Sequence, residues 1–209
     1  MRLNTTDVAS VLRHLPAAVR AALQQEPGRR FLAGGFIRAI IAQETPNDVD
    51  LFVTGDDAAR ALAKELKTPT PAVETGNAIS IDGHAYKVQI IHRWTFATPH
   101  DCVKHFDFTV CAAAVWWDGV AWDSTCDAAF YSDLAAKRLM YRHPTDPEPG
   151  GSMLRLLKFA ARGYVAPPSS IAAIVARLAQ RPLAEARICA DIAGAYGEHD
   201  DDGAGAIAY

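Results

Sequence analysis

Residues 31–53, FLAGGFIRAIIAQETPNDVDLFV, decide the fold of this chain. They contain an apolar lead-in, the pair Gly34 and Gly35, an apolar segment of helical length, a polar loop, and a strand-like segment with two aspartates. Side chains alternate between the two faces of a strand, so Asp48 and Asp50 share one face. The stretch therefore predicts a strand, a glycine turn, a helix and a second strand that carries two carboxylates side by side.

The two aspartates predict a metal site. Neighbouring carboxylates repel each other, and a fold that places them together usually supplies a cation. Mg²⁺ or Mn²⁺ suits this pair, because such hard ions take oxygen ligands and often share them with substrate phosphates. The alternative for Asp48 and Asp50 is two exposed acids on a half-buried strand; the ordered context favours metal binding.

The glycine turn predicts a phosphate site. Gly34 and Gly35 allow backbone N–H groups to approach an anion closely, and the start of the following helix favours negative charge. The alternative is an ordinary tight turn. Arg38, on that helix, is either a phosphate-supporting cation or a helix charge paired with Asp48 or Glu44.

These residues resemble the active-site motif of the polymerase β-like nucleotidyltransferases. They are closest to the head domain of CCA-adding tRNA nucleotidyltransferases and bacterial poly(A) polymerases. In that family a Gly-Gly turn, a helix with an arginine and an Asp-x-Asp strand hold a nucleoside triphosphate and two metal ions. The resemblance implies transfer of a nucleoside monophosphate from an NTP to an acceptor hydroxyl, with release of pyrophosphate and with Asp48 and Asp50 as catalytic metal ligands.

A second segment resembles another motif of the same family. Residues 100–115 contain Asp107-Phe108-Thr109, which matches part of an Arg-Arg-Asp-Phe-Thr motif, with His105 and Phe106 in place of the two arginines. The resemblance makes Asp107 a third catalytic ligand or a ribose contact. The alternative for Asp107 is a structural acid at the start of a strand.

The third carboxylate of the wider superfamily is missing from its usual strand. Residues 78–81 and 86–92 flank Asp82-Gly83, which predicts a β-hairpin. In the resembled family the second strand of this hairpin runs beside the Asp-x-Asp strand and often supplies an acid. Gln89 occupies that place here, and an amide binds Mg²⁺ weakly.

A basic helical face follows the α/β part of the chain. Residues 152–163 resemble the first neck helix of the same family, and Arg155, Lys158 and Arg162 lie three and four residues apart on one face. We predict contacts to the triphosphate or to an RNA backbone. The alternative is an ordinary solvated charged face.

The sequence as a whole predicts an α/β (α+β) fold with a mixed, mostly antiparallel sheet, flanking helices and a short C-terminal helical extension. The expected division is a nucleotidyltransferase-like head over residues 1–147, a helical neck-like extension over 148–196, and a flexible tail over 197–209.

Composition sets the remaining limits. The chain has 209 residues, 50% hydrophobic and 22% charged, with a net charge of −3, and a pI near 6.1. That balance argues mildly against a protein built to grip long nucleic acid. The four cysteines lack CxxC spacing, which argues against a zinc site. We expect a cytoplasmic protein, because neither a signal peptide nor a membrane-spanning run is recognisable.

Two classes of function remain open at this point. The first is a metal-dependent nucleotidyltransferase whose acceptor is RNA, such as a tRNA 3′ end, or a protein. The second is a catalytically degenerate module with the same fold that binds nucleotide, RNA or a partner protein. The sequence leaves the oligomeric state open.

Overall fold

The computed structural model describes residues 1–142 and 149–180, with side chains beyond the gap described from residue 150 onward. The chain forms two compact units, Met1–Ala136 and Lys137–Tyr209, and each is described by itself. The predicted tail at 197–209 and part of the linker lie outside the described residues. The limits 1–147 and 148–196 therefore stay predictions.

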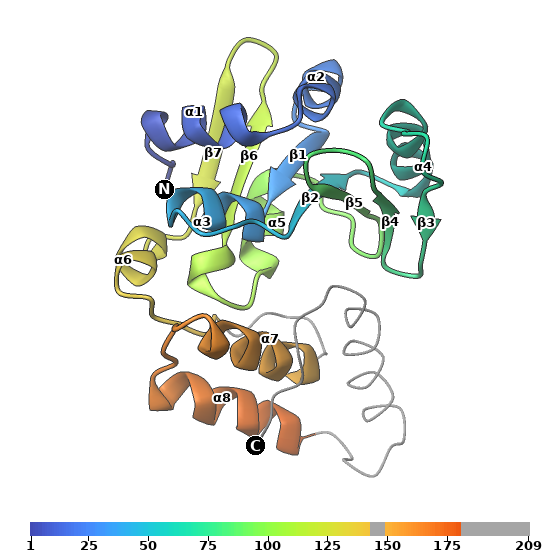
Figure 1. The fold of residues 1–209 in the computed structure, drawn as a ribbon. Coiled ribbons are helices and arrows are strands. Elements are labelled where there is room, and N and C mark those ends of the chain that lie inside the picture. The colour runs from blue at the N-terminus through green and yellow to red at the C-terminus, as the bar shows by residue number, and fades with distance from the viewer. Residues whose placement is uncertain (143–148, 181–209) are drawn as a thin grey trace. The chain divides into compact units, whose positions relative to one another are not determined.

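Unit 1 is built on one sheet (Figure 1). Within the described residues its strands are β1 (Arg30–Ala33), β2 (Asp48–Val53), β3 (Val73–Glu74), β4 (Ala78–Ile81), β5 (Lys87–Ile91), β6 (Ala113–Trp117) and β7 (Trp122–Cys126). They lie in the order β3-β4-β5-β2-β1-β6-β7. Among these described strands, only β2 and β5 pair in parallel. The predicted mixed, mostly antiparallel sheet is confirmed.

Six α-helices and a short 3₁₀ turn complete the described part of unit 1. They are α1 (Thr5–His14), α2 (Ala17–Gln25), α3 (Gly35–Ile41), α4 (Asp56–Glu65), α5 (Pro99–His105), η1 (Thr109–Cys111) and α6 (Phe130–Ala135). Pro16 separates α1 from α2, since proline lacks the N–H that would continue the first helix.

The two faces of the sheet bury different side chains. Leu32, Val49 and Leu51 are fully buried on one face, and α1 and α3 cross in front of the sheet in Figure 1. Helix α5 contacts β1, β6 and β7, and its Cys102 packs in a cluster with Phe31. The Asp-x-Asp side chains belong to the face that α5 partly covers, because they alternate with Val49 and Leu51 along β2.

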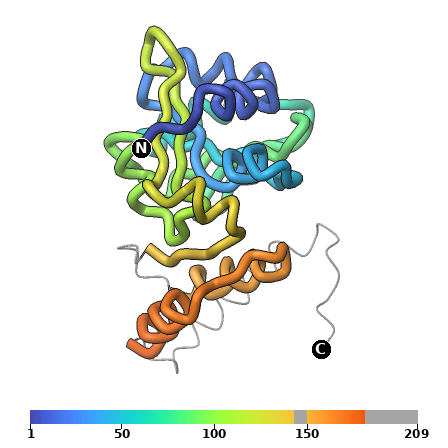
Figure 2. The backbone as a smooth tube through the Cα atoms, turned by 90° about the vertical axis from the view of Figure 1, so that its left-hand side faces the viewer, coloured from blue at the N-terminus to red at the C-terminus, as the bar shows by residue number. Residues whose placement is uncertain are grey.

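The hairpin predicted at Asp82-Gly83 is present, and β6 and β7 form a second hairpin. Strands β4 and β5 pair around Gly83, which has φ +95°, and β6 and β7 pair around Gly119, which has φ +108°. The tip of the β6–β7 hairpin extends past α1 and α2 in both views of the backbone (Figures 1 and 2).

Unit 2 contains two described helices, α7 (Pro149–Ala161) and α8 (Pro168–Ala179). A short extended segment precedes them, in which Arg138 bridges Val165 in parallel. The Tyr141 N–H donates to Ser170 Oγ at 3.0 Å, which ties this segment to α8. The predicted helical extension is thus present in the described residues.

No helix within the described residues combines the length and the apolar character needed to cross a bilayer.

Candidate active site

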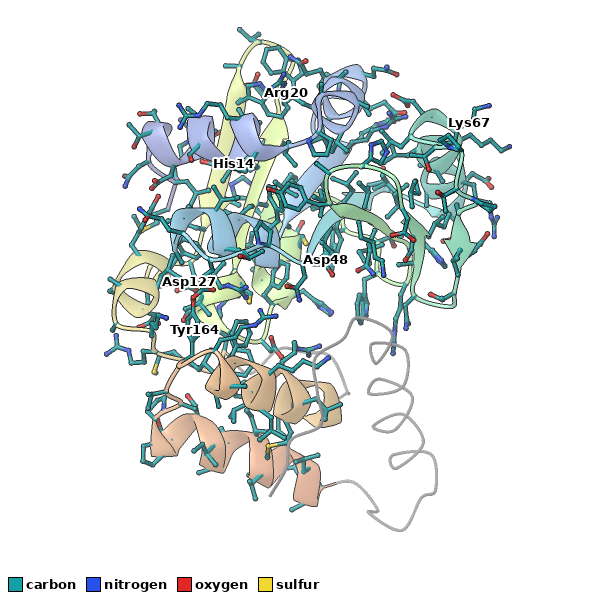
Figure 3. All side chains as sticks on the ribbon, viewed as in Figure 1. His14, Arg20, Asp48, Lys67, Asp127 and Tyr164 are labelled. Carbon is teal, nitrogen blue, oxygen red and sulfur yellow. The ribbon has the colours of Figure 1, made fainter. Side chains whose placement is uncertain are left out.

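Strand β2 places Asp48 and Asp50 on one face of the sheet, as the alternation predicts. Val49 and Leu51 have no exposed surface, whereas both aspartates are half-buried. Figure 3 labels Asp48 at the start of β2, well separated from the tip of the β6–β7 hairpin. The strand therefore carries two carboxylates on one face and buried apolar side chains on the other.

The two carboxylates are electrostatically crowded. Burial raises the pKa of Asp50 well above its ordinary value of 3.8, and the neighbouring charge of Asp48 raises that pKa further. A cation beside the pair would lower the pKa of Asp50 again, since a positive charge favours the ionised carboxylate. Asp50 is therefore held in an environment that suits a positively charged ligand.

Gly34 brings the glycine turn against Asp50. Its φ of +88° lies in the region that L side chains rarely adopt, and a Cβ at this position would lie 3.0 Å from the Phe106 ring and 3.9 Å from Asp50 Oδ2. The Gly34 N–H donates to the Ala113 carbonyl at 3.0 Å, so this donor is already used within the sheet. Gly35 is the first residue of α3. The turn and the aspartates thus share one location, as predicted.

Arg38 points into the protein. It is 5% exposed, its Nε lies 3.5 Å from Glu44 Oε2, and its Nη1 lies 3.9 Å from Cys111 Sγ. The predicted pairing with Glu44 is present. The guanidinium braces α3 against the loop before β2 and against η1, and a role for Arg38 in phosphate binding stays a prediction.

Strand β5 completes the row of side chains on the aspartate face. In the parallel register Asp48 lies opposite Lys87 and Asp50 lies opposite Gln89. Gln89 therefore occupies the place where the resembled family often carries its third acid. Lys87, which the sequence reasoning did not single out, adds a positive charge beside Asp48; its hairpin position is visible in the sequence, but its partner depends on the parallel register.

Asp107 lies in a different setting. It is 4% exposed and follows α5. The next polar residue, Thr109, donates from Oγ1 to Asp133 Oδ2 at 2.6 Å. Within residues 1–142 and 149–180, no three His, Cys, Asp or Glu side chains form a group that could hold a metal ion. The structure thus does not bring Asp107 together with Asp48 and Asp50 as a third ligand.

The basic face of the extension belongs to unit 2. Arg155 and Lys158 lie on α7 and Arg162 directly follows it, and all three side chains are exposed. Leu154, Leu156 and Phe159 form the buried side of the helix. The shared basic face is present, and its role toward a nucleotide or RNA stays a prediction.

The donor set fits a hard divalent cation. Mg²⁺ in proteins is commonly held by one or two carboxylates, while water and substrate phosphates fill its remaining positions. Asp48 and Asp50 supply such a pair, and the raised pKa of Asp50 marks charge that a cation would compensate.

The fold is that of known nucleotidyltransferases. The Thermotoga maritima CCA-adding enzyme complexed with tRNA is similar, with a TM-score of 0.60 and 17% identity over 83% of this chain and 45% of that chain. A CCA-adding enzyme with ATP has a TM-score of 0.60 and 18% identity over 80% of this chain and 45% of that chain. A CCA-adding enzyme with CTP has a TM-score of 0.57 and 19% identity over 78% of this chain and 42% of that chain. The chain spans less than half the length of each of these proteins. The predicted polymerase β-like nucleotidyltransferase fold is confirmed.

A search of curated proteins found no significant match. A family model described as "Gad2: Gabija anti-defense 2 family protein" matches residues 8–137. This range contains β1 to β7 and every site residue of unit 1 discussed above.

Proposed function

We propose that this chain, which belongs to the Gabija anti-defense 2 family, is a metal-dependent nucleotidyltransferase. It would move a nucleoside monophosphate from an NTP to an acceptor hydroxyl and release pyrophosphate. The acceptor would be an RNA, such as a tRNA 3′ end, or a protein. The family description gives an anti-defense role and no chemistry, so the proposal depends on the site.

The observation that carries the proposal is the pair Asp48 and Asp50 beside the Gly34 turn. A half-buried carboxylate pair with a raised Asp50 pKa costs stability unless something compensates its charge. A nucleotidyltransferase uses such a pair to bind its divalent cation. The solved relatives described with ATP, CTP and tRNA support the same class of ligand.

Each group of the site has a role in this scheme. Asp48 and Asp50 would hold Mg²⁺ or Mn²⁺, which when bound offsets the negative charge of the phosphates during transfer. Gly34 and Gly35 would let the triphosphate approach the backbone, because neither residue carries a side chain of its own. Arg38 would hold α3 in place through its ion pair with Glu44.

Four further predicted residues lie outside this core. Asp107 would contact the ribose or, since it is nearly fully buried, support the residues of the site. The exposed Arg155, Lys158 and Arg162 would bind the triphosphate or the acceptor through their positive charge.

One observation favours a second candidate function. Gln89 stands opposite Asp50 in the strand register, where an acid would assist catalysis in the resembled family. A chain that kept the fold but lost this acid would bind nucleotide, RNA or a partner protein without catalysis. Binding and transfer therefore need separate measurements.

The test is transfer of a labelled nucleotide. The full chain would be incubated with Mg²⁺ or Mn²⁺, each labelled NTP and total RNA or protein extract, beside the double variant Asp48→Asn/Asp50→Asn. Asp57→Asn is the matched control, because Asp57 is a fully exposed acid on α4. Labelled product from the wild type and the control, reduced roughly 10³-fold or more in the double variant, is the expected result. The absence of labelled product from all three proteins would contradict the proposed transferase activity.

A further inference from the structure

A cluster of partly exposed rings borders the candidate site. It consists of Trp94, Phe96, His105 and Phe106, here called the ring cluster, and each member is half-buried. The His105 ring lies 5.5 Å from Trp94 and 5.2 Å from Phe96 between centroids. The four rings come from the segment before α5 and from the end of that helix.

The inner edge of the ring cluster touches the site. The Phe106 ring lies against Gly34, where a Cβ would be 3.0 Å from it, and Asp50 Oδ2 is 3.9 Å from the same point. Phe96 packs on Phe52 with ring centroids 5.9 Å apart. Phe52 follows Asp50 by two residues on the same strand, so it shares the face of the aspartates.

The outer edge of the ring cluster carries a cation. The Arg93 guanidinium lies 4.9 Å from the centroid of the Trp94 ring, and Arg93 is exposed. Its Nη1 donates to Asn77 Oδ1 at 3.0 Å, which fixes the guanidinium beside the ring. An aromatic ring next to an arginine is the combination by which proteins bind single-stranded nucleic acid, through stacking and cation–π contacts.

Phe96 and Phe106 pack against the buried cluster that contains Phe31 and Cys102, so core packing explains these two rings, but it does not explain Trp94. The aromatic residues that build the core of unit 1, such as Phe31, Phe36 and Phe108, have at most 1% exposed surface. Trp94, by contrast, lies in a segment without helix or strand and keeps part of its large apolar surface in solvent.

We propose that Trp94, with Arg93 and His105 beside it, is a stacking subsite for a nucleobase of a ligand whose phosphates bind the cation that Asp48 and Asp50 would hold. The inference rests on the proposed function for its class of ligand. It adds that recognition comes from the base and not only from the phosphates. The base belongs either to the NTP or to the 3′ end of a single-stranded RNA acceptor.

Binding measurements on the full chain test the subsite. Affinities for ATP, for inorganic tripolyphosphate and for a short single-stranded RNA would be measured with Mg²⁺ present, for the wild type, Trp94→Ala and Trp94→Phe. Trp122→Ala is the matched control, since Trp122 forms a ring pair with Trp117 on the β6–β7 hairpin. Loss of a stacked ring is expected to weaken the base-bearing ligand roughly 5- to 140-fold. Trp94→Phe should retain most of the affinity, and tripolyphosphate binding should not change.

The outcomes separate the possible sources of the base. Weaker ATP binding assigns the base to the donor, and weaker RNA binding assigns it to the acceptor. Unchanged affinities for both in Trp94→Ala, an equal loss in Trp122→Ala, or no binding of either ligand by the wild type would overturn the subsite. Trp94-dependent binding without any labelled product would support the subsite and reject the transfer reaction. Thermal unfolding of each variant checks that it folds.

Discussion

Two acidic regions of unit 1 sit in opposite environments. Asp133 on α6 has no exposed surface and accepts a hydrogen bond from Thr109 at 2.6 Å. Asp50 on β2 is half-buried, and burial together with the charge of Asp48 raises its pKa. The first carboxylate is satisfied by the protein around it, whereas the second stands beside a like charge. The contrast separates an acid that supports the fold from an acid placed for a ligand.

The largest expected effect on stability is at Asp133, the acid that supports the fold. Asp133→Ala should lower the free energy of unfolding by about 3 kcal/mol, because it removes a buried acceptor and leaves the Thr109 hydroxyl without this hydrogen bond. Urea unfolding measures the change. Asp57→Ala, which removes an exposed acid from α4, should stay within about 0.5 kcal/mol of the wild type. Equal stabilities of the two variants would remove the distinction between the regions.

At the candidate site, a substitution is expected to stabilise the protein and not to destabilise it. Asp50→Asn should raise the free energy of unfolding of the metal-free protein by about 1 kcal/mol, since it removes a crowded charge at a position kept for function. The raised pKa means that the folded state binds a proton more tightly than the unfolded state does. Stability of the wild type should therefore fall as pH rises from 3.8 toward the raised value, and Asp50→Asn should lose this slope.

A divalent cation should cancel this pH dependence. Mg²⁺ favours the ionised form of Asp50, so it should raise the melting temperature more at about pH 8 than at about pH 5. Melting curves with Mg²⁺ and with EDTA across that range measure the difference. A rise that is the same at every pH, or that persists in Asp48→Asn/Asp50→Asn, would place the cation elsewhere.

The sequence predicted the local geometry of residues 31–53 for a physical reason. Residues 31–53 are local in the chain, and the alternation of a strand fixes the shared face of Asp48 and Asp50 without any tertiary information. The hairpin signal at Asp82-Gly83 is equally local. These features depend on spacing alone, and the structure contains each of them.

The site features that the sequence did not predict depend on contacts between segments far apart in the chain. Lys87 became a neighbour of Asp48 only through the parallel β2–β5 register. Phe106 reached Gly34 through the docking of α5 on the sheet, and neither spacing nor composition encodes that contact. The direction of Arg38 was also undetermined from the sequence, because a helix charge can face solvent or a buried partner such as Glu44.

The smallest expected effect tests the register itself. Gln89 lies opposite Asp50 on β5, so Gln89→Glu would add a third carboxylate to the same face. The metal-free protein should lose about 1 kcal/mol of stability through like-charge repulsion. Its affinity for Mg²⁺ should increase about tenfold, because ligand charge tunes the affinity of such sites.

Calorimetric titration with Mg²⁺ measures that gain. Gln24→Glu makes the same chemical change on the exposed side of α2 and should leave Mg²⁺ affinity unaltered. A gain in transfer activity along with the gain in affinity would mean that Gln89 limits catalysis. A gain in affinity alone would favour a site kept for binding. No gain at all would mean that the Gln89 side chain does not reach the cation, and the two-carboxylate pair would then act without help from β5.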